Sequence, residues 1–262
     1  MAVFDQTVPD ANDEKWSEER YAHIVFFTNM HPDKRRKIDG TLRVCVYCME
    51  NTSHLDKIIS IVKENINDYF FSGSDGENIV AQWKDTRCVK DSNIVLGTVL
   101  FELQSFPVQH SGDQKDPVRL VNEYSKERFP DAVLVGYDEI NNVWKPSDAA
   151  PALYWRLSGQ KNSERILPAY RTAWYDTTLH LHIVSPGRAT QNTIAQTVQN
   201  DFDRKKVLRF PDQSCMRVDW KNTVSLDADI FRRGQLTVEA TYCVYFTPEP
   251  AEKLKYLNIK EQ

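Results

Sequence analysis

Alternating apolar and polar positions mark four long segments of the chain as β-strands. In Leu42–Tyr47 and in Thr178–Val184 every second residue is apolar, which is the period of a strand with one buried face. Thr98–Ser105 and Gln235–Phe246 follow the same rule, and each ends shortly before a proline. The sequence therefore predicts two similar pairs of long strands, one pair in each half of the chain.

Helical periodicity follows the first strand of each pair. In the first half, with Ser53 as the expected N-cap, apolar residues recur at three- and four-residue intervals. This first stripe consists of Leu55, Ile58, Ile59, Val62 and Ile66. In the second half, a Ser-Pro-Gly turn leads to a second stripe formed by Ile194, Val198 and Phe202. Each stripe predicts a helix that packs one face on the neighbouring sheet.

Outside the helices, the two halves of the chain align with each other at one constant difference in residue number, which we call the repeat offset. The helix stripes align best at 194 − 58 = 136, so one residue must slip in the loops on either side. Asp39-Gly-Thr-Leu-Arg-Val-Cys-Val aligns with Asp176-Thr-Thr-Leu-His-Leu-His-Ile, so the repeat offset is 176 − 39 = 137. At the same offset, the repeat-equivalent pairs are Trp83 with Trp220 (each within a Trp-Lys-x-Thr run), Gly97 with Gly234, and Glu102 with Glu239. The alternative is that two similar βαβ segments share a register by accident. We interpret the match as two diverged copies of one domain, since tryptophan is a rare residue.

Each copy is expected to be a small α-β-β-α-β-β domain. Copy two begins with a predicted helix at Pro117–Phe129 and a strand at Ala132–Tyr137, whereas copy one keeps only a short candidate helix near Asn12–Arg20. A further strand follows in each, at Ala22–Phe27 and Ala152–Leu157. The expected class is α+β, with a mostly antiparallel sheet and helices on one face.

These elements divide the chain into four parts. Polar residues and a glycine mark the exposed linker between the copies. The predicted parts are copy one at 1–107 with a shortened N-terminal region, a linker at 108–116, copy two at 117–248, and a C-terminal extension at 249–262.

Composition narrows the classes of function. The 262 residues carry a net charge of −4, without the basic excess of a dedicated nucleic-acid binder. No apolar run is long enough to span a bilayer and no signal peptide is visible, so we expect no membrane partner. The five cysteines are sparse and odd in number, which indicates reduced thiols rather than a secreted disulfide scaffold.

Candidate catalytic and metal-binding residues are better explained structurally. Cys45 and Cys48 form a CxxC motif, but Cys45 lies within a predicted strand and not at a helix N-terminus, where a redox thiolate is stabilised. His180 and His182 share a strand face, yet Arg43 and Cys45 replace them in copy one. We therefore predict two unrelated thiols, a histidine pair facing solvent or an interface, and no enzyme activity, cofactor or metal site.

Two basic runs and an apolar tail are the candidate interaction segments. The basic runs consist of Lys34, Arg35, Arg36 and Lys37, and of Arg204, Lys205, Lys206 and Arg209. They are either solvated loops or contacts for an acidic protein rim or for passing phosphates. The tail, a candidate docking segment for a partner, carries Leu254, Tyr256, Leu257 and Ile259.

The succession of a Pro-Ala-Leu-Tyr-Trp-Arg-Leu strand, a long loop, the Asp176–Ile183 strand and a helix resembles the tail-terminator and neck (head-to-tail joining) proteins of tailed bacteriophages. The resemblance is best over Pro117–Pro248, and copy one is similar to the same domain with its first helix and strand eroded. It implies a virion structural protein that forms a ring at the tail or neck, caps the tail tube and joins it to the head. It also implies no catalytic residues.

The partners implied by this resemblance are other copies of the chain, as a trimer or hexamer, and tail tube, sheath or neck proteins. DNA is expected only transiently, and the location is the virion after assembly in the host cytoplasm. Strands ending at Gln104 and Phe246 are expected to be edges that pair between subunits. The alternative is a cellular two-domain protein- or RNA-binding module, although Phe101 and Val238 lack the matched aromatic pattern of an RNA-binding sheet. The third hypothesis is an enzyme, which would require His, Cys and carboxylate side chains to converge in the folded chain.

Overall fold

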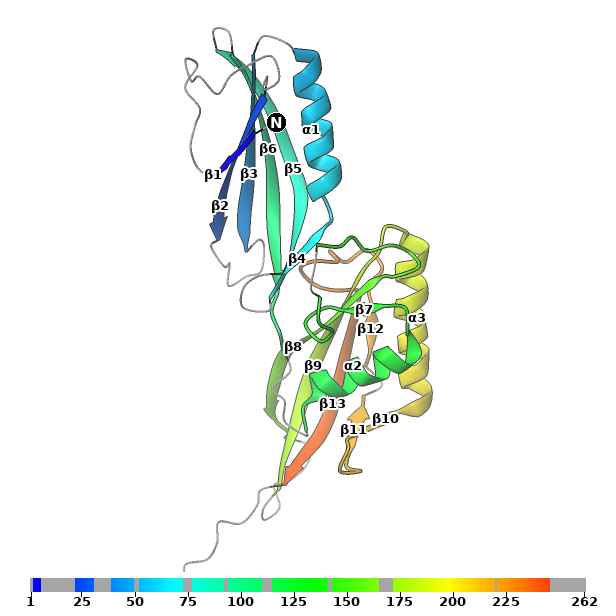
Figure 1. The fold of residues 1–262 in the computed structure, drawn as a ribbon. Helices are drawn as coiled ribbons and strands as arrows, with labels where there is room; N and C mark the ends of the chain where they lie inside the picture. The colour runs from blue at the N-terminus through cyan, green and yellow to red at the C-terminus, as the bar shows by residue number, and fades with distance from the viewer. Residues whose placement is uncertain are drawn as a thin grey trace, which may run out of the picture.

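The computed structural model describes most of the chain as two sheets and three helices. The described residues are 2–5, 22–30, 39–49, 52–72, 77–91, 94–109, 115–140, 143–164, 172–219 and 221–245. The two sheets follow one another along an elongated molecule, with α1 and α3 on the same side of it (Figure 1). We call the first sheet with its helix the first unit, and the second sheet with its two helices the second unit.

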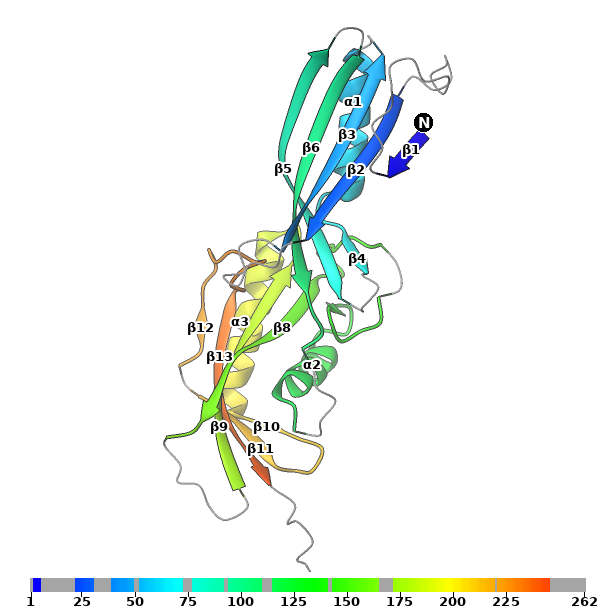
Figure 2. The ribbon, with the colours of Figure 1, turned by 90° about the vertical axis from the view of Figure 1, so that its left-hand side faces the viewer.

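The first unit is a six-stranded sheet covered by one helix. The strand order is β1-β2-β3-β6-β5-β4, with β1 parallel to β2 and all other neighbours antiparallel. Its elements are β1 Ala2–Asp5, β2 Ala22–Met30, β3 Gly40–Met49, α1 Thr52–Ile66, β4 Phe70–Ser72, β5 Asn78–Asp91 and β6 Ile94–Phe106. Helix α1 packs its apolar stripe on every second residue of β3 and β6, which include Val44, Val99 and Phe101. No helix of the described residues covers the other face of the sheet (Figure 2).

The second unit is built in the same way with two helices on one face. The strand order is β10-β11-β13-β9-β8-β7, with β7 parallel to β8, and β12 also pairs with β13. Its elements are α2 Pro117–Arg128, β7 Val133–Leu134, β8 Ala152–Asn162, β9 Thr172–Val184, α3 Arg188–Lys205, β10 Val207–Arg209, β11 Cys215–Val218, β12 Thr223–Val224 and β13 Leu236–Tyr245. Trp155, Leu181, Phe202 and Val238 belong to one buried core between helices and sheet. The predicted α+β class with mostly antiparallel sheets is confirmed.

Many backbone pairings of β3, β4, β5 and β6 coincide with pairings of the second sheet when the repeat offset is applied. Val44 pairs with Val99 in the first sheet, and Leu181 pairs with Leu236 in the second. The same offset converts three further pairs into pairs of the second sheet. They are Phe70–Val80 into Val207–Arg217, Ala81–Leu103 into Val218–Ala240, and Gly40–Leu103 into Thr177–Ala240. The two sheets therefore share their strand order and much of their register.

The segment that leads from the helix back to the sheet also has equivalent hydrogen bonds in the two units. The amide of Ala81 donates to the carbonyl of Tyr69 at 3.3 Å. At the repeat offset, the amide of Val218 donates to the carbonyl of Lys206 at 2.9 Å. A register irregularity follows Trp83 in β5. At the equivalent position, between Val218 and Thr223, β11 gives way to β12.

Several predicted elements differ in detail. The strand predicted at Ala132–Tyr137 is only Val133–Leu134, because the chain then turns: the Asp138 side chain accepts from the Leu134 amide at 2.9 Å. Helix α1 includes Ser53 in its first turn instead of starting after it. The first unit also has a parallel edge strand, β1, where the sequence predicted an eroded one, because its pairing with β2 is non-local. The candidate helix near Asn12–Arg20 lies outside the described residues.

The prediction of free edges at Gln104 and Phe246 is wrong for the strands concerned. Both β6 and β13 are interior strands with neighbours on each side, and the strand order ends instead at β1, β4, β7 and β10. Alternation shows which face of a strand is buried, but it does not show which neighbours the strand acquires. Phe246 itself lies outside the described residues.

The segment between the units ends in a helix cap. Strand β6 ends at Phe106 and α2 begins at Pro117, so the described part of the predicted linker is short. The Asp116 carboxylate accepts from the amides of Val118 and Arg119 at 2.8 and 3.2 Å. This side chain satisfies amides that the first turn of α2 leaves unpaired. No helix in the described part of the chain is long and apolar enough to cross a membrane.

Candidate interaction surfaces

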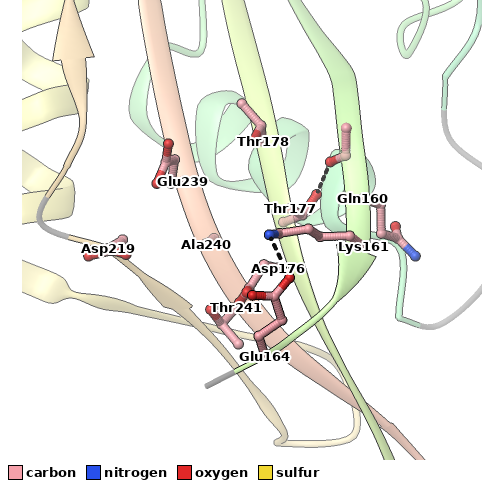
Figure 3. Close-up of a pocket in the computed structure, with 11 residues that line it drawn as sticks. Gln160, Lys161, Glu164, Asp176, Thr177, Thr178, Asp219, Glu239, Ala240 and Thr241 are labelled. Atoms are coloured by element: carbon pink, nitrogen blue, oxygen red, sulfur yellow. Dashed lines mark hydrogen bonds and ion pairs between the residues drawn. The ribbon is translucent and has the colours of Figure 1, made fainter. Parts of the chain in front are cut away.

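An acidic cavity lies on the face of the second sheet that the helices do not cover. On β9 and β13, Leu179 and Val238 point into the core, so their neighbours point to the opposite face. The cavity there has a volume of about 560 Å³ and is shown in Figure 3. Its charged lining residues are Lys161, Glu164, Asp176, Asp219 and Glu239.

Short polar contacts organise this cavity. The Thr241 hydroxyl donates to the Asp176 carboxylate at 2.7 Å, and Lys161 lies 3.5 Å from the Glu164 carboxylate. Histidine and cysteine are missing from its described lining. Nor do three or more His, Cys, Asp or Glu side chains form a metal-binding group anywhere in the described ranges. What the cavity offers is an acidic, hydrogen-bonding surface.

A second cavity of about 500 Å³ lies further along the same face. Arg156, His180 and Arg233 line it together with Asp227 and Asp229. Burial, and then the positive charge of Arg156, lower the pKa of His180. The Asp229 carboxylate accepts from the Phe231 and Arg232 amides at 3.0 and 3.2 Å, so it stabilises the turn before β13.

An aromatic core joins the two units, and we call it the junction. Phe70 and Phe106 from the first unit are fully buried against side chains of the second. The ring of Phe70 stacks on Trp144 with centroids 5.3 Å apart, and Phe106 meets Tyr154 edge-on at 4.9 Å. Phe231 belongs to the same cluster. This contact fixes the lower end of the first sheet to the upper end of the second (Figure 1).

Polar bonds surround the aromatic residues of the junction. The Tyr154 hydroxyl donates to the Pro107 carbonyl at 2.9 Å. Arg232 lies 3.4 Å from Glu102, and Lys145 donates to the Asn67 carbonyl at 2.9 Å. Each of these bonds joins the two units or the short connection between them. The junction therefore holds both the distance and the orientation between the units.

The candidate redox and metal residues do not converge. Cys45 and Cys48 are buried free thiols on opposite faces of β3, and burial raises the pKa of both, that of Cys48 to about 11. His182 is fully buried at the junction, where its Nδ1 lies 2.7 Å from the Ile230 carbonyl oxygen. His180, by contrast, faces the second cavity. The two histidines thus have different surroundings.

One predicted basic run gathers at the far end of the second unit, and we call this set the basic end. It consists of Arg204 and Lys205 in the last turn of α3, Lys206 at its C-cap, Arg209 on β10, and Arg217 on the adjacent strand β11. All five side chains are exposed, and within the described ranges none forms an ion pair. Sequence reasoning missed Arg217, because only the pairing of β10 with β11 brings it near the others.

The repeat-equivalent residues have separate roles. Trp83 is 46% exposed, with the Lys63 ammonium 3.6 Å from its ring centroid. A Cβ on Gly97 would lie 2.6 Å from Ile59 Cδ1, so the glycine lets α1 approach β6. Gly234 instead has a left-handed φ of 75° beside the Leu181 carbonyl. The remaining predicted positions lie outside the described residues: Trp220, Lys34, Arg35, Arg36, Lys37, Leu254, Tyr256, Leu257 and Ile259.

Comparisons of the chain with protein-family models, with curated proteins and with solved structures gave no match.

Proposed function

We propose that this chain is a structural protein built from two tandem copies of one domain, which assembles with other copies into a ring at the tail or neck of a virion. The observation that carries the proposal is the register that the two sheets share at the repeat offset. The assignment to a tail-terminator or neck ring adds the resemblance of the second copy to that class of phage protein.

A common origin accounts for the register better than chance does. Two unrelated sheets would set their own loop lengths, so their residue offsets would drift from strand to strand. Here one offset holds for the pairs between β4 and β5, between part of β5 and β6, and between β3 and β6, while β8 is displaced from β2 by 152 − 23 = 129. The helices differ slightly in length, since α3 has 18 residues and α1 has 15.

The arrangement of the units favours assembly. Both units present their helices to the same side, and the lower end of one meets the upper end of the other (Figure 1). Such a head-to-tail contact uses two different surfaces, which is the kind of contact that produces closed rings when repeated between chains. The buried aromatic side chains of the junction join the two units of each chain through a common core.

The buried positions of the central strands support assembly over RNA binding. An RNA-binding sheet of the expected kind needs exposed aromatic side chains on its central strands. Phe101 and Val238 are both fully buried against helices, and their neighbours on the open faces, Glu102 and Glu239, are carboxylates and not aromatic. The exposed features include the charged cavities and the basic end, which suit electrostatic contacts with other tail or neck proteins.

Measurement of the native mass tests this proposal. A ring of three or six chains has three or six times the mass of one chain, which is 30.4 kDa. We expect one of these species by light scattering, and a ring with a central opening by electron microscopy. A chain that stays at 30.4 kDa at all protein concentrations and at low salt contradicts the proposal.

A further inference from the structure

The edge of β4 is occupied within the chain, whereas its counterpart in the second unit has no neighbour among the described strands. Phe70 in β4 exchanges two backbone hydrogen bonds with Trp144, which lies in the segment before β8, at 2.8 and 3.2 Å. At the repeat offset, Phe70 corresponds to Val207 in β10. Strand β10 ends the strand order of the second sheet and has no neighbour beyond it among the described strands. The described part of the chain thus leaves this edge of β10 available to a second molecule.

The surroundings of the two edges differ in a way that suits a reversible contact. The junction residues Phe70, Val80 and Phe106 correspond to Val207, Arg217 and Cys243. The aromatic side chains are replaced, and Lys206 and Arg209 flank the edge. The contact on β4 within the chain is thus aromatic, whereas the edge of β10 carries positive charge. Charge keeps a free surface soluble and steers an oppositely charged partner towards it.

The chain itself contains a segment of opposite charge at the equivalent place. Trp144 lies eight residues before Ala152, whose pairing with Val184 corresponds to the pairing of His23 with Tyr47. The segment before His23 covers residues 6–21, and it carries Trp16, seven residues before His23. This segment has five acidic residues against two basic ones: Asp10, Asp13, Glu14, Glu18 and Glu19 against Lys15 and Arg20.

We propose that residues 6–21 of one copy bind the basic end of the second unit of the next copy, with Trp16 at the outer edge of β10. The proposal rests on the proposed self-assembly and specifies the surface that performs it. Each chain supplies one acidic segment and one basic end, so the contact is heterologous and repeats around a ring. Because it depends on exposed charges, salt weakens it.

Charge reversal and charge exchange test the contact in the full-length chain. Lys205→Glu/Arg209→Glu reverses two charges at the basic end, and Glu18→Lys/Glu19→Lys reverses two in the acidic segment. Lys57→Glu/Lys90→Glu is the matched control, since both lysines are exposed in the first unit, away from the basic end. Circular dichroism verifies the fold of each variant, and light scattering over a concentration series gives the mass.

We expect each double variant to dissociate at protein concentrations about tenfold or more above those of the unmodified chain, as the loss of a few exposed charge pairs implies. The chain with all four reversals should regain assembly, and the control should assemble normally. If Lys205→Glu/Arg209→Glu assembles like the unmodified chain, the inferred contact is wrong while self-assembly stands. If the unmodified chain is a monomer throughout, both proposals are wrong.

Discussion

Phe70 in β4 and Trp144 before β8 exchange both of their backbone hydrogen bonds and stack their rings 5.3 Å apart. The pairing covers the outer edge of the first sheet with a segment of the second unit. An exposed edge strand is a site of unwanted association. Here the edge becomes part of the connection between the units, where the Phe70 ring is fully buried.

Removal of the Phe70 ring should uncouple the two units. Phe70 is fully buried, so Phe70→Ala is expected to cost about 3–5 kcal/mol of unfolding free energy. Because the lost contacts lie between the units, we expect urea unfolding to separate into two transitions. Tryptophan fluorescence and circular dichroism, followed in parallel, will detect the separation.

The neighbouring residue Phe71 supplies the matched control. It packs against the core of the first unit, on the opposite face of β4 from the junction. Phe71→Ala should therefore destabilise the chain without separating the transitions. A single, merely shifted transition for Phe70→Ala would contradict the role given to the junction.

Gly97→Ala should force α1 away from the first sheet. The added Cβ would lie 2.6 Å from Ile59 Cδ1 and 2.9 Å from Leu55 Cδ1. Overpacking of this kind costs about 1–3 kcal/mol, measured as unfolding free energy. The double variant Gly97→Ala/Ile59→Val shortens the opposing side chain and should recover part of the lost unfolding free energy. Gly159→Ala is the control, because nothing lies within 4 Å of its Cβ position.

Asp148 should make the second unit sensitive to acid. Its carboxylate accepts hydrogen bonds from the Ser185 hydroxyl and, at 2.7 Å, from the Gly187 amide before α3. These bonds, with one from Thr190, hold the pKa of Asp148 below its ordinary value. The stabilisation is therefore present above pH about 4, the unfolded value, and is lost as the pH falls through the lower folded value.

Thermal unfolding between pH 6 and pH 2.5 measures this effect. We expect Asp148→Asn to have a lower midpoint than the unmodified chain at pH 6 and a smaller decrease on acidification. Asp131→Asn changes an exposed aspartate between α2 and β7 and serves as the control. Parallel pH profiles for the unmodified chain and Asp148→Asn would show that this carboxylate does not stabilise the fold.

Thiol labelling should distinguish the cysteines by burial. Burial raises the pKa of Cys48 to about 11, so at pH 8 it has little thiolate, and Cys45 is similarly buried. Cys88 is exposed. Iodoacetamide followed by mass spectrometry should label Cys88 first, and Cys45 and Cys48 only in denaturant. Early labelling of Cys48 in the native chain would contradict its burial in the core.

Local patterns predicted much of the fold. The alternation around Val44, Leu181 and Val238 identified strands that each bury one face, and the stripe from Leu55 to Ile66 identified α1. The elements that local patterns did not predict depend on contacts between segments far apart in the sequence. The two-residue strand β7 and the edge strand β1 have no periodicity of their own, and each depends on parallel pairing with a distant strand.

The surfaces were harder to predict for the same reason. Arg204 to Arg209 are close in sequence and were identified as a basic run, whereas Arg217 joins them only through the pairing of β10 with β11. The junction was not anticipated, because Phe70 and Phe106 alternate like ordinary core residues. Only the position of the second unit shows that they pack outside their own sheet.

Strand β6 belongs to two cores at once. Val99 and Phe101 lie under α1, while Phe106, at the end of the same strand, is surrounded by Tyr154 and Phe231 of the second unit. A pulling force on one unit would therefore reach the other along a hydrogen-bonded strand, without first straightening a flexible tether.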